Sequence, residues 1–290
     1  MQRPTHSPSH GARLNLRLPT LGGQVFWTDR AAQSGWRVQT HALTGHGRVL
    51  DQHNCRRGWG NYSTMQQTLR STAPKASKRP RHIAVLVHGL GGNSLTFRKM
   101  RKMLRAEGYR VLDFKYASIL TQIEEQAEAL FQFLCSLDAE KVTLITQSMG
   151  GLVADRTLGM GTRAGETINI GRISVAGIVR IGTPCDGSTL ARRIVSLFGA
   201  KRLSRTPLAE VGIGLPPHAA SDRIAHLNIA GSLNKGRGIN PWINGNDDGL
   251  VGISEVIRDD RANTLIVNAS HYSLTSNPMA IDAVRSFLSE

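Results

Sequence analysis

The sequence predicts an α/β fold in which a mostly parallel sheet is covered by helices on both faces. From residue 82 onward, short apolar runs rich in β-branched residues alternate with segments of amphipathic helical periodicity. This alternation is typical of parallel sheets, because the crossover between two parallel strands usually contains a helix. The chain of 290 residues is long enough to bury such a core. Its composition, 40% hydrophobic and 20% charged, is that of a globular protein and not of a disordered or fibrous one.

Six apolar stretches are the predicted strands of this sheet. Each is short and is bounded by polar residues or glycine, as buried strands usually are. They comprise residues 82–87, 109–116, 142–146, 173–182, 228–230 and 264–269.

Capping signals predict where several of the intervening helices begin. Thr121 and Glu124 have the spacing of a capping box, in which each side chain accepts the backbone N–H of the other residue at the first turn of a helix. A further helix is expected after Gly150. Asn277 and Pro278 are suited to be the cap and the first residue of a closing helix. Proline fits at the first position because an N–H there would have no acceptor within the helix.

The net charge of +15 is unevenly distributed along the chain. Residues 1–82 contain 13 Lys and Arg against 2 Asp and Glu, whereas the remaining 208 residues contain 23 against 19. The stretch 71–81 has the composition of a linker. We therefore expect a basic N-terminal extension over residues 1–80 and a main domain over residues 82–290.

Parts of the extension have the pattern of β-structure. Two segments, GQVFWTDR and GWRVQTHAL, could form a hairpin, and RLNLRLPTL alternates apolar with polar residues. We expect the extension to be partly ordered and packed on the main domain. It could also attach to an anionic membrane surface, whereas nucleic acid is not an expected partner because the main domain is only slightly basic.

Several classes of protein are not expected. No segment approaches the roughly 20 unbroken apolar residues of a membrane-spanning helix. The first residues lack the apolar run of a secretory signal, so a cytoplasmic location is expected. Cys55, Cys135 and Cys185 are far apart and form no CxxC pair, so we expect free thiols and neither a disulfide framework nor a zinc site.

The pentapeptide TQSMG, residues 146–150, stands between a predicted strand and a predicted helix. A serine nucleophile must project from the fold, and a tight strand-to-helix turn achieves this if its neighbours two positions away are small. Gly150 and Gly151 satisfy that requirement downstream, whereas Thr146 stands where the pattern G-x-S-x-G has its first glycine. The alternative is that Ser148 is only the N-cap of a helix.

Glycines after the first predicted strand offer a second element of such a site. The segment HGLGG, residues 88–92, can direct a backbone N–H toward an oxyanion, and Leu90 and Met149 are the candidate donors. No GK[ST] follows these glycines, and the GxGxxG spacing is absent, so a phosphate loop is not predicted. His88 is expected to bond locally through its ring and not to act as a second base.

Two further segments supply a carboxylate and a base. His271 follows the last predicted strand, and Asp247 and Asp248 lie in a glycine-containing turn upstream of it. The resulting order of Ser, Asp and His along the chain is the one found in strand-turn-helix hydrolases.

These motifs resemble those of the α/β-hydrolase superfamily, and specifically of its lipases and esterases, over residues 82–290. The matching segments, in family order, are VLVHGLGG, TQSMGG, IGTPCDGS, NDDGLV and ASHYSL. The resemblance does not extend to residues 1–80. The chain departs from the family pattern at Thr146 and in the long excursion between Gly231 and Asn246.

The resemblance implies a catalytic triad of Ser148 as nucleophile, His271 as general base and Asp248 as the orienting acid. In relatives the acid directly precedes the glycine of DG-x-V, so Asp247 would face solvent or cap the turn; Asp222 is the next candidate acid. The fold implied is the α/β-hydrolase fold, with a possible cap or lid around residues 185–225. Neither a cofactor nor a metal is needed.

The function implied is that of a serine carboxylester hydrolase, a lipase-like esterase that acts on a small-molecule or lipid ester through an acyl-enzyme intermediate. An acyltransferase or a thioesterase would use the same triad, and the sequence does not separate them. The alternative from another class is a non-catalytic binding module in which the hydrolase fold is a scaffold and the basic N-terminal region engages nucleic acid or a membrane.

Overall fold

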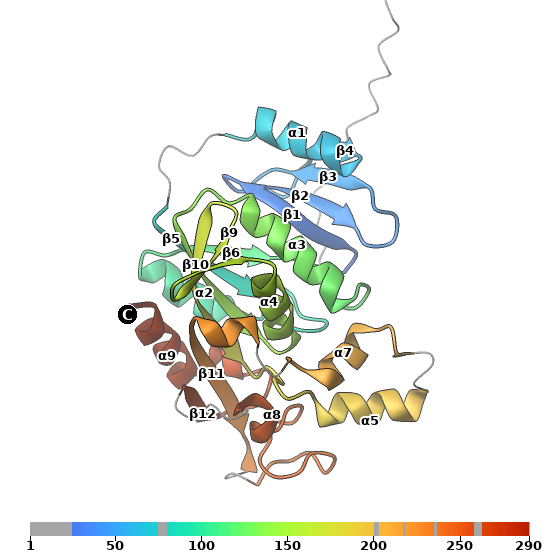
Figure 1. The fold of residues 1–290 in the computed structure, drawn as a ribbon, viewed down its shortest axis with the longest axis vertical. Helices are drawn as coiled ribbons and strands as arrows, with labels where there is room; N and C mark the ends of the chain where they lie inside the picture. The colour runs from blue at the N-terminus through green and yellow to red at the C-terminus, as the bar shows by residue number, and fades with distance from the viewer. Residues whose placement is uncertain are drawn as a thin grey trace, which may run out of the picture.

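The computed structural model describes residues 25–74, 80–199, 203–216, 219–234, 237–257 and 263–289. These residues form a large sheet flanked by helices and a smaller antiparallel sheet next to it (Figure 1). The alternating segment RLNLRLPTL and residues 75–79 of the predicted linker lie outside the described residues.

The large sheet has six parallel strands in the order β12-β11-β10-β7-β5-β6. All six predicted strands are present. They are β5 (His82–Val87), β6 (Arg110–Phe114), β7 (Lys141–Gln147), β10 (Ile173–Ile181), β11 (Ala225–Ser232) and β12 (Thr264–Asn268). The prediction of a mostly parallel α/β sheet is therefore confirmed.

A short hairpin that the sequence did not predict extends this sheet. Its strands are β8 (Thr162–Ala164) and β9 (Thr167–Ile170). β9 pairs antiparallel with the first residues of β10, and β11 pairs with the later residues of β10. Apart from the two pairings of this hairpin, all strand pairings in the described part of the large sheet are parallel.

Alternating side chains of each strand pack on opposite layers of helices. In β5, Ile83, Val85 and Val87 join the core beneath α3 (Ile123–Cys135) and α4 (Met149–Gly159). Ala84 and Leu86 join the core beneath two other helices. Those helices are α2 (Arg98–Ala106) and α9 (Pro278–Ser289).

One predicted helix start is correct and one is wrong. Asn277 Oδ1 accepts the N–H of Met279 at 2.9 Å, as expected for the cap of α9. The capping box at Thr121 and Glu124 does not form, because α3 begins at Ile123 with Gln122 as its N-cap. Instead, the N–H of Ile123 donates to Glu210 Oε2 of another helix, 2.8 Å away, so a tertiary contact replaces the local cap.

The smaller sheet contains the predicted hairpin and two further strands. Its strands lie in chain order and are all antiparallel. They are β1 (Trp27–Gln33), β2 (Trp36–His41), β3 (Gly47–Leu50) and β4 (Arg56–Gly60), followed by α1 (Tyr62–Thr72). The sheet lies between α1 and α3, as Figure 1 shows.

Asp29 of β1 joins this sheet to the large one. Its N–H donates to the carbonyl of Lys115 at 2.8 Å, and its Oδ2 accepts the N–H of Lys115 at 3.0 Å. The carboxylate also accepts from Gln39 at 2.8 Å and from Arg37 at 2.9 Å. Asp29 is fully buried, and both of its carboxylate oxygens accept hydrogen bonds.

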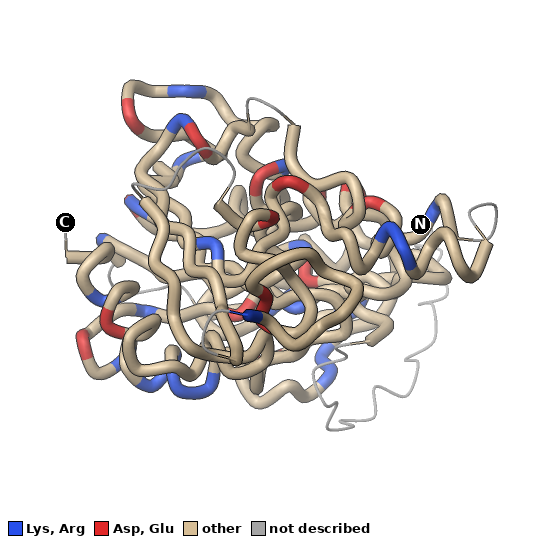
Figure 2. The backbone as a smooth tube through the Cα atoms, turned by 90° about the horizontal axis from the view of Figure 1, so that it is seen from below, with Lys and Arg blue, Asp and Glu red and all other residues tan. Residues whose placement is uncertain are grey.

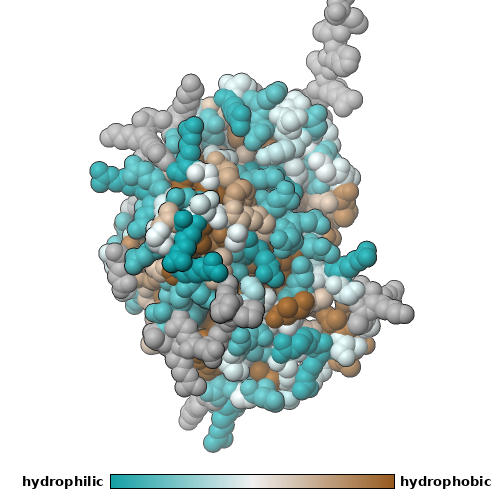
Figure 3. Space-filling model, in the orientation of Figure 1, coloured by the Kyte–Doolittle hydropathy of each residue, from teal (hydrophilic) through white to brown (hydrophobic). Residues whose placement is uncertain are grey.

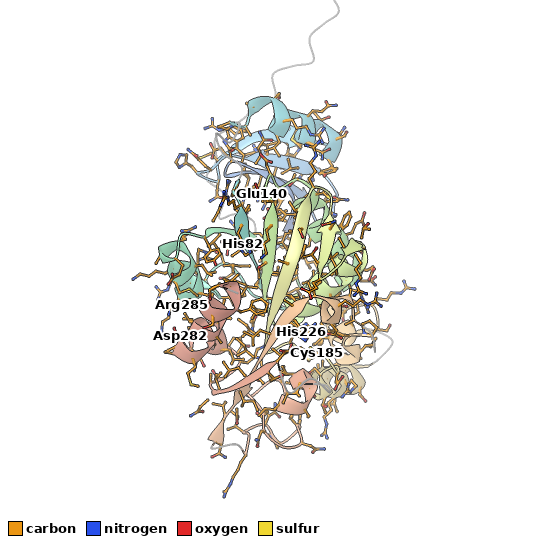
Figure 4. The ribbon with its side chains drawn as sticks, turned by 60° about the vertical axis from the view of Figure 1, so that its left-hand side comes forward. His82, Glu140, Cys185, His226, Asp282 and Arg285 are labelled. Carbon is orange, nitrogen blue, oxygen red and sulfur yellow. The ribbon has the colours of Figure 1, made fainter. Side chains whose placement is uncertain are left out.

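The direction of the parallel strands in the large sheet determines at which end the candidate site lies. His82 and Glu140, at the amino ends of β5 and β7, lie at the end of the sheet nearest the antiparallel sheet (Figure 4). Cys185, which follows β10, lies toward the opposite end. The remaining elements lie after β10 along the chain, and they are α5 (Thr189–Phe198), α7 (Pro207–Ile213), η1 (Ala220–Arg223), α8 (Ile253–Ile257) and η3 (Leu274–Ser276).

Candidate active site

The predicted site residues follow the carboxyl ends of neighbouring parallel strands. His88 follows β5, Ser148 follows β7, and His271 follows β12. Asp248 comes after β11, beyond the excursion that the sequence indicated. Because parallel strands end at one edge of their sheet, these segments converge there, which is where ligands bind in α/β folds.

Ser148 occupies a strained turn between β7 and α4. Its φ of 54° and ψ of −129° are unusual for a residue with a side chain. A Cβ on Gly150 would lie 2.4 Å from the carbonyl oxygen of Val87, and one on Gly151 would lie 2.3 Å from Thr183 Oγ1. Only glycine fits at these two positions, so α4 can start close enough to the sheet to form the turn.

Thr146 is accommodated by the sheet although it replaces the first glycine of the pattern. It is fully buried, and its Oγ1 donates to the carbonyl oxygen of Val179 on the neighbouring strand at 2.9 Å. The close approach of helix and strand therefore depends on Gly150 and Gly151, and not on the residue at position 146.

Asp248 and His271 form a buried hydrogen-bonded pair. His271 Nδ1 lies 2.7 Å from Asp248 Oδ2, and the N–H of His271 donates to the carbonyl oxygen of Asp248 at 2.9 Å. Asp248 Oδ1 accepts the N–H groups of Leu250 and Val251 at 3.0 and 2.8 Å. The carboxylate is thus fixed, and its partner nitrogen must carry a proton, which leaves His271 Nε2 as the acceptor.

The other two acidic candidates have different partners. Asp247 Oδ1 accepts the N–H of Gly249 at 2.7 Å, and its Oδ2 accepts the N–H of Ile239 at 3.0 Å, so this buried carboxylate caps the turn. Asp222 Oδ1 accepts from Arg180 Nη2 at 2.7 Å.

Several hydrogen bonds hold the loop after β5. The N–H of Gly89 donates to Gln147 Oε1 at 3.1 Å, and the carbonyl oxygen of Gly89 accepts from His88 Nδ1 at 2.8 Å. The N–H of Gly92 also donates to that carbonyl, at 3.1 Å. His88 therefore bonds locally, as predicted, and burial lowers its pKa to about 4.

The two candidate oxyanion donors, Leu90 and Met149, stand at this loop and at the first turn of α4. Met149 is the first residue of that helix, where the backbone N–H has no intrahelical acceptor. Both residues line a cavity of about 480 Å³ together with Ser148 and His271.

Much of the wall of this cavity is apolar. Two helices from the region predicted as a cap or lid, α5 and α7, contribute to it. The apolar lining residues are Pro184, Leu190, Ala191, Ile194, Leu208, Val211, Leu250 and Val251. On the outer surface, brown atoms lie over α5 and α7 in Figure 3, where Leu197, Phe198 and Ile213 are exposed.

Solved structures with the same architecture exist. Over 75% of this chain and 94% of the other, it superposes on the Bacillus licheniformis lipase BlEst2 in mature form with a TM-score of 0.52 at 18% identity. Over 76% of this chain and 79% of the other, it superposes on the metagenomic carboxyl esterase MGS0156 with a TM-score of 0.50 at 17% identity. The chain has the α/β-hydrolase fold. No family model matches the sequence, and no curated protein matches it either.

Two residues of this candidate site were not identified from the sequence. Gln147 holds the N–H of Gly89, and Thr183 Oγ1 donates to the carbonyl oxygen of Ser148 at 3.0 Å. Gln147 directly precedes the serine, but its partner is 58 residues away along the chain, so no local pattern marks its role. Thr183 lies in the segment IGTPCDGS. The sequence signal for its position is Gly151, because a side chain there would collide with the hydroxyl of Thr183.

The described residues include neither a cluster of metal ligands nor a helix that could span a membrane. Within the described ranges, no three His, Cys, Asp or Glu side chains are placed to hold a metal ion together. Among the helices of the same residues, none has both the length and the apolar character that crossing a bilayer requires.

Proposed function

We propose that this protein is a serine carboxylester hydrolase that acts through Ser148, His271 and Asp248. The observation that carries the proposal is the combination of a buried Asp248–His271 pair and a serine on a strained turn at the wall of the same cavity. A hydrogen-bonded Asp fixes the histidine tautomer, and the remaining ring nitrogen can then accept the proton of a serine hydroxyl.

In the proposed first step, Ser148 Oγ attacks the ester carbonyl while its proton passes to His271 Nε2. The tetrahedral oxyanion accepts hydrogen bonds from the N–H groups of Leu90 and Met149. Collapse of this intermediate breaks the bond to the alcohol, which leaves with the proton from His271. The acyl group remains on Ser148 as an ester.

In the second step, His271 accepts a proton from water as the water oxygen attacks the acyl-enzyme. Collapse of the second intermediate returns the proton to Ser148 Oγ and releases the carboxylic acid. No metal or organic cofactor takes part. The apolar wall supplied by α5 and α7 suits an apolar acyl group, and the likeness to a lipase and a carboxyl esterase supports an ester as the substrate.

Labelling with a fluorophosphonate probe tests the proposal, because this reagent requires an activated serine. The full chain is incubated with the probe, and the labelled peptide is identified by mass spectrometry. We expect the label on Ser148 and none on Ser148→Ala, together with hydrolysis of short p-nitrophenyl esters by the parent protein alone. A folded parent protein that takes no label would favour the non-catalytic binding module.

Product analysis separates hydrolysis from acyl transfer. The parent protein is given a p-nitrophenyl ester with and without an excess of a short alcohol or thiol. We expect free acid as the main product in both cases. A new ester or thioester as the main product would identify an acyltransferase with the same triad.

The basic extension is proposed to favour contact with anionic lipid surfaces. Residues 1–82 hold 13 basic against 2 acidic side chains. Over the described residues, blue and red segments both occur along the chain in the view of Figure 2. We expect sedimentation with vesicles containing anionic lipid to fall as salt is raised, because added ions screen the attraction. Equal sedimentation with neutral vesicles would contradict this contact.

A further inference from the structure

A second cavity, of about 430 Å³, lies between the antiparallel sheet and the edge strand β6 of the large sheet. Its walls come from the β1–β2 turn, from α1, from β6 and from the end of α3. No residue that lines it also lines the catalytic cavity. Elsewhere along this junction the two sheets are joined by buried hydrogen bonds, such as those of Asp29 with Lys115, so the open space is a local feature.

Cationic groups without carboxylate partners stand in its wall. Arg70 of α1 and Arg110 of β6 both line the cavity, and neither makes an ion pair within the described residues. The carboxylate of Asp113, which also lines the cavity, is taken by Arg101 at 2.5 Å. Asp138 lies in the wall as well, and it is the remaining acidic group there.

The same wall holds donors that lack an acceptor. Arg37 donates from Nη1 to Asp29, but its Nε has no partner within the described residues, and neither does the hydroxyl of Ser34. Native proteins pair nearly all buried polar groups, so these two donors mark a part of the wall whose own acceptors are incomplete.

Apolar surfaces complete the cavity. Trp36, Leu112 and Phe133 line it, and Phe133 is otherwise part of the main core. A cavity of this volume with an aromatic wall and a few polar groups is in the range that binds small organic molecules. The flat face of an indole beside guanidinium groups suits a ligand with an apolar body and an acidic group.

We propose that this cavity binds a small organic anion, with its carboxylate or phosphate held by Arg70 and Arg110 and its apolar body against Trp36. Because the cavity is built from both sheets, such a ligand would hold them together and raise the melting temperature. This binding does not depend on the hydrolase chemistry proposed above.

Calorimetric titration of the full chain with 2-naphthoate tests the proposal. We expect saturable binding of one molecule, and weaker binding of 2-naphthol, which has the same body without the charge. Parallel titrations with 2-naphthyl phosphate and with inorganic phosphate decide which acidic group is preferred and whether the apolar body is needed. Arg70→Gln and Arg110→Gln should each weaken binding of the preferred anion about tenfold, since each removes a charge-assisted hydrogen bond.

Control variants distinguish binding in this cavity from binding at the exposed surface or in the catalytic cavity. Arg105→Gln removes a guanidinium from exposed surface outside the cavity and should leave binding unchanged. Arg70 is also exposed, so Arg70→Gln should fold normally even if Arg110→Gln does not. Ile194→Trp narrows the catalytic cavity and should have no effect. The proposal is overturned if 2-naphthol binds as well as the anions, if Arg70→Gln binds like the parent protein, or if Ile194→Trp abolishes binding.

Discussion

The ring of His88 donates from Nδ1 to the carbonyl oxygen of Gly89, 2.8 Å away, and this carbonyl belongs to the same peptide unit as the N–H of Leu90. A peptide unit is planar, with its C=O and N–H pointing in opposite directions. A bond that fixes the carbonyl therefore fixes the direction of the N–H that we propose as an oxyanion donor. The N–H of Gly92 adds a second bond to the same oxygen.

His88→Ala should consequently lower kcat for p-nitrophenyl esters while KM changes little. Losing an oxyanion donor outright costs about 10²- to 10³-fold, so a misdirected donor should cost about 10- to 100-fold. His88→Asn should recover part of the loss, because its amide can donate to the same carbonyl. Equal losses in both variants, or a loss in KM alone, would show that the ring does not orient this peptide.

The buried state of His88 also predicts how stability depends on pH. Its pKa is lowered from 6.5 to about 4 by burial, so in the window between these values the unfolded chain binds a proton that the folded chain does not. Stability is then complete above the unfolded pKa and falls as pH decreases through the window. The full effect is about 3 kcal/mol at 1.36 kcal/mol per pKa unit.

Urea denaturation at pH 7 and at pH 4.5 measures this effect. The free energy of unfolding of the parent protein should decrease more than that of His88→Asn over this range, because the variant has no titrating group at this position. Parallel decreases would assign the pH dependence to other groups.

Asp248 and Asp247 are predicted to differ sharply in their effect on turnover. Asp248→Asn keeps the shape but offers the wrong partner to His271 Nδ1, and such a change in a triad costs about ten-thousandfold in kcat. Asp247→Asn should keep most of kcat and instead lower the melting temperature, because Asp247 accepts N–H groups within its own loop. Measurement of kcat for the two variants side by side decides the assignment, and a reversed pattern would refute it.

Ser148→Gly should produce a more stable but inactive protein. Ser148 has a φ of 54°, a region that glycine adopts without the clash that a Cβ causes. Relief of this strain should raise the free energy of unfolding by about 1 kcal/mol relative to Ser148→Ala, which keeps the Cβ. Thermal and urea denaturation of the two inactive variants provide a matched comparison. A lower stability for the glycine variant would mean that the turn is not strained.

The antiparallel sheet is predicted to be required for folding of the rest of the chain. Asp29→Ala removes the acceptor of Arg37 and Gln39 and leaves the N–H of Lys115 without its side-chain partner. Breaking a buried charged network in this way costs about 3 to 5 kcal/mol. We expect Asp29→Ala to show a much lower urea midpoint, and a deletion of residues 1–70 to be insoluble. A soluble, active deletion variant would show that the large sheet folds alone.

The segments that form the candidate site could be located from sequence because most of them carry a local signal. Gly150 and Gly151 mark the turn at Ser148, and the glycines after β5 mark the loop at Leu90. The pairing of Asp248 with His271 is a tertiary contact, and only the family pattern favoured Asp248 over its neighbour. The structure contains this hydrogen bond, and the catalytic roles of the two residues are predictions.

The remaining structure could not be predicted because its causes are not local. The N-terminus of α3 is held by Glu210, 87 residues away, and this contact replaces the box expected at Thr121 and Glu124. Strand β4 has the sequence RRGWG, which has no alternating pattern, and it is a strand because it pairs with β3. Thr146 is accommodated because its hydroxyl donates to the carbonyl oxygen of Val179 on β10, a contact between residues far apart along the chain.

The helices α5 and α7 lie in one stretch of the chain between β10 and β11, whereas the proposed catalytic groups lie after four other strands. A mutation that reshapes the apolar wall at Ile194 or Leu208 therefore leaves the reacting atoms in place. Most of the apolar wall is thus encoded in one stretch of the gene, and its other two residues, Leu250 and Val251, follow Asp248. A single recombination event that exchanged this stretch would replace the part of the wall built by α5 and α7 in one step, and chimeric proteins could be built on the same principle.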